Sequence, residues 1–141
     1  MSSNIPVSEV MKRKTIVIDV EESVEKAAKV MKANDVGSII VTDRGAVGIV
    51  TERDICWKVV AEGHSAKTTK VKQIMSTPLK TIEPTATLEQ AAEKMKKEGV
   101  KRLVVLNKHQ ELVGIISYSD ILKILPAVID IVEERARIEK D

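Results

Sequence analysis

The chain has 141 residues, a formal charge of +2, 43% hydrophobic residues and 31% charged residues. It is long enough to bury one core or two small ones, and so low a charge gives no argument for a nucleic-acid or membrane partner. No apolar run approaches the ~20 residues that cross a bilayer, and the N-terminus lacks the pattern of a signal peptide. A single cysteine, Cys56, excludes an intrachain disulfide, so we expect a cytoplasmic protein with Cys56 on a buried helix face.

The first half of the chain predicts a strand, a helix and a hairpin, in that order. Residues 15–18 are all β-branched, and Ser23 is suited to cap a helix whose apolar face includes Val24, Ala27 and Met31. Apolar runs at 38–41 and 47–50 flank a turn that contains glycine. Because these runs show little alternation, we expect both faces of the sheet to be covered.

The hairpin ends in the pattern glycine, two apolar residues, Ser or Thr, and an aspartate three positions later. Here it runs from Gly48 through Thr51 to Asp54. Ser or Thr followed by an acidic residue at this spacing is typical of a helix capping box. A hydroxyl and a carboxylate at a strand tip could instead bind the hydroxyl groups of a sugar. Both interpretations are open at this point.

The second half repeats the first. Met75 follows Met11 by 64 positions, and Gly114, Ser117 and Asp120 follow their counterparts by 66, with the two extra residues in the connection at 107–111. Residues 62–70 are polar and without periodicity, and they indicate the linker. We predict an α/β (α+β) protein with two pseudo-symmetric β-α-β-β-α repeats, 1–66 and 67–125, packed through their sheets.

A helical tail, 126–141, is expected to follow the repeats after a break at Pro126. Residues 128–132 continue an apolar face into a charged end, 133–137. We expect that face to pack on the body of the protein or on a second subunit.

These residues resemble a known family. Two strand–helix–strand–strand–helix units, each ending in Gly-apolar-apolar-Ser/Thr-x-x-Asp, are similar to a tandem pair of cystathionine β-synthase (CBS) domains, or Bateman module. The resemblance covers residues 7–125 and leaves no room for a catalytic domain. It implies a stand-alone module that binds AMP, ADP or ATP in two clefts between the repeats, with no obligatory cofactor.

The resemblance also implies the site residues. In such modules the Ser/Thr and Asp of one repeat hold the ribose, and segments of the other repeat surround the adenine and meet the phosphates. One cleft would combine Thr51, Asp54, Lys80, Val100, Lys101 and Arg102. The other would combine Ser117, Asp120, Lys14, Thr15, Gly37 and Ser38.

The charges of these residues make the two clefts unequal. Lys101 and Arg102 can neutralise phosphate, whereas Gly37 and Ser38 at the matching places carry no charge, so the first cleft is predicted to be the better phosphate site. The alternative for Lys101 and Arg102 is a solvated strand edge that discourages aggregation. Arg53 could add a phosphate contact or be an exposed surface arginine.

Other classes of function remain alternatives. The chain has no Walker loop, His-Glu-x-x-His or Cys-x-x-Cys, so no catalytic residue or metal ligand is predicted. A ligand-free interaction or scaffold module would use both aspartates only as caps, and a weak nucleic-acid binder would use the basic segments 12–14 and 67–72 without aromatic stacking platforms. We predict a non-enzymatic regulatory sensor, a homodimer that signals to an effector protein by conformational change.

Overall fold

The computed structural model describes residues 4–124, so the predicted tail at 126–141 lies outside the described residues. The chain divides into two compact units. Within the described range, unit 1 contains residues 4–13, 81–108 and 113–124, and unit 2 contains residues 14–80 and 109–112. Residues 4–13 thus lie in the unit that holds most of the second repeat, and residues 67–80 in the unit that holds most of the first. The repeat boundaries expected at 66 and 67 stay a prediction.

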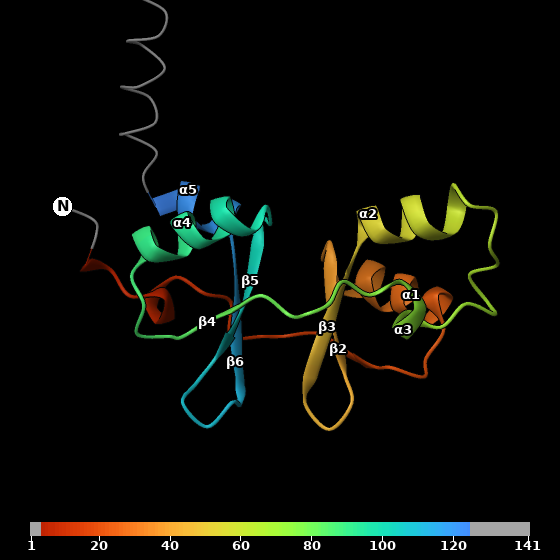
Figure 1. Ribbon diagram of the computed structural model, residues 1–141, viewed down its shortest axis with the longest axis horizontal. Coiled ribbons are helices and arrows are strands. Elements are labelled where there is room, and N and C mark those ends of the chain that lie inside the picture. The colour runs from red at the N-terminus through yellow and green to blue at the C-terminus, as the bar shows by residue number, and fades with distance from the viewer. Residues whose placement is uncertain (1–3, 125–141) are drawn as a thin grey trace, which may run out of the picture. The chain divides into compact units, whose positions relative to one another are not determined.

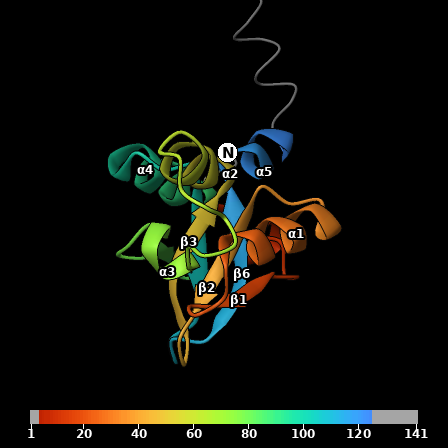
Figure 2. The same cartoon turned by 90° about the vertical axis from the view of Figure 1, so that its right-hand side faces the viewer.

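Unit 2 holds the elements of the first repeat. Its elements are β1 (Val17–Asp19), α1 (Val24–Asn34), β2 (Ser38–Thr42), β3 (Ala46–Thr51), α2 (Glu52–Ile55), the π-helical stretch η3 (Cys56–Val60) and α3 (Val71–Ile74). The sheet order is β1-β2-β3, with β1 parallel and β3 antiparallel to β2. The β2–β3 hairpin is labelled in Figure 1. Figure 2, which turns this unit toward the viewer, shows α1 and α3 on either side of the β2–β3 hairpin.

Unit 1 repeats the arrangement. Its elements are the 3₁₀ turn η2 (Val7–Glu9), β4 (Thr81–Ile82), α4 (Leu88–Glu98), β5 (Arg102–Leu106), β6 (Leu112–Ser117) and α5 (Tyr118–Ile124). The sheet order is β4-β5-β6, and β4 is parallel to β5. The predicted mixed fold with two repeats is confirmed, and how the repeats pack through their sheets stays a prediction.

The two long helices begin where the sequence predicts. The Ser23 hydroxyl accepts a hydrogen bond from the Lys26 N–H at 3.0 Å at the start of α1. Thr87 and Gln90 form a reciprocal capping box at the start of α4. These bonds satisfy backbone N–H groups that have no partner inside a helix.

The central strand of each sheet is buried on both faces. In β2, Ile39, Ile40 and Val41 are each at most 1% exposed, and the same holds for residues 103–105 of β5. Successive side chains of a strand point to opposite faces, so three consecutive buried residues require cover on both sides. Each unit has its own apolar cluster, which joins the central strand to α1 in unit 2 and to α4 in unit 1.

Each sheet is extended by a segment that carries one of the repeated methionines. Lys12 forms an antiparallel bridge with Ile115 in β6, and Ser76 forms the equivalent bridge with Ile49 in β3. A Cβ atom on Gly114 would lie 2.6 Å from the Met11 Sδ and 2.9 Å from the Lys12 carbonyl oxygen. The glycine of each pattern therefore leaves room for this segment, a role that the local sequence does not indicate.

The segment expected to be a linker is docked on unit 2. The first N–H groups of α1 donate to the carbonyl oxygens of Thr69 and Ala66 at 2.9 and 3.0 Å. Just before α1, Glu21 accepts hydrogen bonds from Lys72 and Lys70, which lower the pKa of its carboxyl group. Within residues 4–124, none of the helices has the length and apolar character needed to span a bilayer.

The expectation that Cys56 is buried is wrong. The buried side chains of the helical segment at 52–60 are Asp54 and Val59, and Cys56 is exposed. It lines an open groove of about 430 Å³, together with Met31 and Val60. The capping geometry turns Asp54 inward, and this rotation places Cys56 at the surface.

Candidate functional site

Thr51 and Asp54 form a reciprocal capping box at the junction of β3 and α2. The Asp54 N–H donates to the Thr51 Oγ1 at 3.1 Å, and the Thr51 N–H donates to the Asp54 Oδ2 at 2.9 Å. Ser117 and Asp120 repeat this geometry between β6 and α5, with distances of 3.1 and 3.0 Å. The predicted capping boxes are therefore present in both repeats.

The two carboxylates are buried although each carries a charge. Asp54 is 8% exposed and Asp120 is 7% exposed, and they are the buried polar residues among those that the structure describes. A buried charge is costly unless hydrogen bonds and opposite charges compensate it. A cap alone needs no such burial, since N-cap bonds form equally well at the surface.

Asp54 has two partners beyond its cap. The Lys58 Nζ lies 3.0 Å from the Asp54 Oδ1, one helical turn away. The Ser76 Oγ lies 3.4 and 3.5 Å from the two carboxylate oxygens. Sequence reasoning missed both residues: the i,i+4 spacing could have indicated Lys58, whereas Ser76 is brought there only by its bridge with Ile49.

Asp120 has a different environment. Its Oδ1 faces the Lys12 Nζ at 3.7 Å, and the Lys12 side chain is 61% exposed. The Ser117 hydroxyl is also 2.9 Å from the Ser119 hydroxyl. The two aspartates thus share a cap and differ in the cation beside them.

The remaining predicted residues lie at strand starts and before strands. Gly37 and Ser38 are beside Thr51, because the Glu52 N–H donates to the Gly37 carbonyl at 3.0 Å and Ser38 pairs with Thr51. In unit 1, the Tyr118 N–H donates to the Lys101 carbonyl at 2.8 Å. Five further residues lie just before a strand or begin one. Lys14 and Thr15 precede β1, Lys80 precedes β4, Val100 precedes β5, and Arg102 is the first residue of β5.

These contacts of the predicted residues each join residues of the same repeat. The predicted grouping of each aspartate with residues of the other repeat stays a prediction. Arg53 is exposed, and its guanidinium lies 3.8 Å from the centre of the Trp57 ring. This cation–π contact places the guanidinium group of Arg53 over the indole ring of Trp57.

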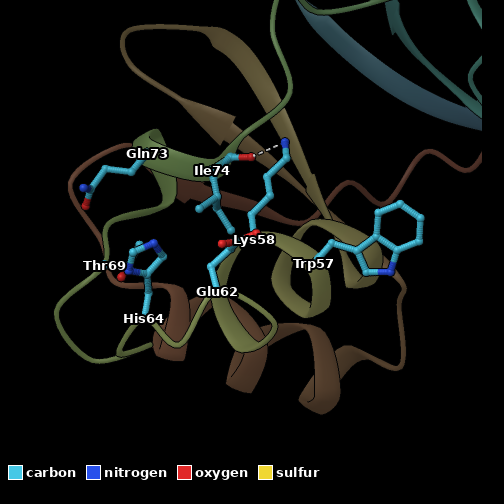
Figure 3. Close-up of a pocket in the computed structure, with 7 residues that line it drawn as sticks. All are labelled: Trp57, Lys58, Glu62, His64, Thr69, Gln73 and Ile74. Carbon is cyan, nitrogen blue, oxygen red and sulfur yellow. Dashed lines mark hydrogen bonds between the residues drawn. The ribbon is translucent and has the colours of Figure 1, made fainter.

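A pocket of about 340 Å³ lies between η3, the docked linker and α3. Its lining residues come from three parts of unit 2. They are Trp57 and Lys58 of η3; Glu62, His64 and Thr69 of the segment 62–70; and Gln73 and Ile74 of α3. Figure 3 shows the Lys58 side chain reaching toward Ile74, while the Trp57 ring points away from it.

Comparison with known proteins agrees with this arrangement of two repeats. A family model described as CBS domain matches residues 7–60 and again residues 71–127. The chain belongs to the CBS domain family. The match in two copies, over most of the chain, confirms the resemblance that the glycine–aspartate pattern indicates.

Three other proteins resemble most of the chain. The CBS domain-containing protein YhcV of Bacillus subtilis is 31% identical over 116 residues, which cover 82% of this chain and 81% of YhcV. An uncharacterized conserved protein of Pyrococcus horikoshii is 28% identical, with a TM-score of 0.80 and coverage of 87% and 93%. A CBS domain protein of Pyrobaculum aerophilum, solved in complex with AMP, is 32% identical with a TM-score of 0.76, covering 82% of this chain and 89% of that protein.

Proposed function

We propose that the protein is a non-enzymatic regulatory CBS module that binds an adenine nucleotide, AMP, ADP or ATP. The observation that carries this proposal is the buried carboxylate of Asp54 and of Asp120, each held at the tip of a strand by the same reciprocal bonds. A CBS protein that is 32% identical is complexed with AMP, which supports an adenosyl ligand here.

The chemistry of the two aspartates suits a ribose. A carboxylate can accept hydrogen bonds from two vicinal hydroxyl groups, and such charge-assisted bonds are stronger than neutral ones. Its cap bond holds the carboxylate in one rotamer, which reduces the entropy lost on binding. As the family resemblance implies, residues of the other repeat would complete each cleft, with Lys101 and Arg102 toward the phosphates in one and Lys14 in the other.

Signalling would follow from preferential binding. A nucleotide that contacts both repeats stabilises the arrangement in which both sets of contacts are made. An effector protein would then recognise that arrangement. The nucleotide is a regulatory ligand in this proposal, and no reaction step is assigned to any residue.

Calorimetry with AMP, ATP, NAD and S-adenosylmethionine tests the proposal. We expect an adenine nucleotide to bind, and the double variant Asp54→Asn with Asp120→Asn to weaken its binding at least about tenfold, because each lost bond to a charged acceptor costs ~1.5–3 kcal/mol. Asparagine keeps the shape of the side chain and an oxygen for the cap. The matched control is Glu22→Gln with Glu89→Gln, which removes the same charge from exposed positions, one in each unit.

Absence of binding by every one of these ligands would overturn the nucleotide proposal and favour the scaffold alternative. A salt-dependent shift of RNA or DNA at low protein concentration would favour the nucleic-acid alternative instead.

We also propose that the module is a homodimer that associates through helices. The exposed large apolar side chains lie mainly on two of them: Trp57 and Val60 on the segment at 52–60, and Tyr118, Leu122 and Ile124 on α5. Apolar groups on adjacent helical turns form a surface that association would bury. Sedimentation velocity of the wild-type protein should show a dimer. The double variant Trp57→Asp with Leu122→Asp should be a monomer. A wild-type protein that is a monomer at high concentration would contradict the proposal.

A further inference from the structure

The acceptor sites of Asp54 are nearly all in use. The Oδ2 accepts the Thr51 N–H at 2.9 Å, and the Oδ1 is 3.0 Å from the Lys58 Nζ. The Ser76 hydroxyl lies within 3.5 Å of both oxygens. A carboxylate has about four acceptor sites, and these three donors leave about one. The two vicinal hydroxyl groups of a ribose could therefore both donate to Asp54 only if they displaced one of these partners.

Lys58 is held in place by a second acceptor. Its Nζ also donates to the Ile74 carbonyl oxygen at 2.9 Å, as Figure 3 shows. Two bonds fix the ammonium group between Asp54, on the same helical segment, and the end of α3. The pair is also at i,i+4, with the acidic residue nearer the N-terminus, which is the favourable order.

Asp120 has an oxygen available. Its Oδ2 accepts the Ser117 N–H at 3.0 Å, but the Oδ1 is 3.7 Å from the Lys12 Nζ, longer than a hydrogen bond. Among residues 4–124, no buried side-chain oxygen or nitrogen lacks a hydrogen-bond partner. The Asp120 Oδ1 therefore reaches solvent, where a hydroxyl group can approach it.

The difference between the cations near Asp54 and Asp120 follows from the sequence. The position that matches Lys58 in the second repeat, 66 residues on, is Ile124, which carries no charge. The cation near Asp120 is Lys12, which aligns with Ser76 at the 64-residue spacing and lies on an exposed segment. In the described part of the chain, residues 4–124, α5 therefore offers Asp120 no counterpart of the Lys58 ion pair.

We propose that Lys58 is an internal competitor that occupies Asp54, so that Asp120 provides the ribose site that fills first. This inference rests on the proposed nucleotide binding and adds the order of the two sites. The charges of Lys101 and Arg102 predict that the Asp54 cleft is the better site, and this inference reverses that order. A ligand at Asp54 must first break the charge-assisted pair with Lys58. Lys58 thus lowers the affinity of the Asp54 site for the nucleotide, so this site fills only at higher ligand concentrations.

Calorimetry of the full chain with AMP, using single variants, tests the order. Wild type should show one tight and one weak class of site. Asp120→Asn should weaken the tight class at least about tenfold, whereas Asp54→Asn should affect only the weak class. Lys58→Met should strengthen the weak class by about tenfold, because the carboxylate no longer has to lose an ionic partner.

Lys29→Met is the matched control, since it removes the lysine of another i,i+4 ion pair, with Glu25 at 3.2 Å. The Lys29 side chain is 72% exposed and such a surface pair contributes little, so both classes of site should change less than about twofold. Thermal unfolding of each variant checks that it is folded. Two equal classes, or loss of the tight class in Asp54→Asn, would overturn the inference and leave nucleotide binding intact; wild type that binds no AMP would overturn the proposed function itself.

Discussion

Gly114→Ala is expected to lower the free energy of unfolding by about 1–3 kcal/mol, which is the usual cost of an extra methyl group in a packed site. The new Cβ would lie 2.6 Å from the Met11 Sδ and 2.9 Å from the Lys12 carbonyl oxygen. Met11 can change its rotamer, but the carbonyl oxygen belongs to the bridge between Lys12 and Ile115 and cannot move without breaking it. Urea unfolding at neutral pH measures the loss.

Gly48→Ala provides the comparison. There the Cβ would meet the flexible Met75 Sδ at 2.8 Å, and the nearest backbone oxygen, of Ser76, is 3.2 Å away. Because mostly side-chain atoms have to move, the loss should be smaller than at Gly114. Equal stability of Gly114→Ala and wild type would show that the segment around Met11 does not pack on β6 as described.

Leu103→Ala and Ile39→Ala should each destabilise the protein by about 2–5 kcal/mol, the usual cost of truncating a fully buried aliphatic side chain. The two residues occupy matching positions of the repeats, at the start of β5 and β2, and are 0% and 1% exposed. Each belongs to the apolar cluster of its own unit. Chemical denaturation followed by circular dichroism measures both losses.

Ile39→Val is the graded control and should cost about 0.5–1.5 kcal/mol, since it removes one methylene group. Val17→Ala, on the same sheet but 46% exposed, should cost less than either truncation of a buried residue. A loss below that of Ile39→Val for either alanine variant would contradict the burial of the central strands.

The local sequence was sufficient to predict those structural features that depend on residues close together in the chain. The caps at Ser23, Thr87, Thr51 and Ser117 were predictable because each side chain bonds a backbone group only three residues away. The buried central strands were predictable from runs of apolar residues without alternation. The repeat spacing of 64 residues, which becomes 66 after the insertion at 107–111, indicated the duplication and, with the aspartate pattern, the CBS family.

Contacts between distant segments could not be predicted in the same way. Ser76 reaches Asp54 and Lys12 faces Asp120 only because the segments with the repeated methionines extend the two sheets. The exposure of Cys56 follows from the rotation of its helical segment, which the buried Asp54 determines. An apolar face estimated from periodicity alone does not include a buried carboxylate.

The sequence by itself determined the repeats, the order of their elements and the two aspartates that cap helices after strands, because these depend on local bonds and apolar spacing. Only the tertiary structure decided which cation stands beside each aspartate and which segment packs on each glycine. Those pairings join residues up to 108 positions apart, as with Lys12 and Asp120, and no local pattern constrains them. The difference between the two carboxylates is therefore a property of the folded chain.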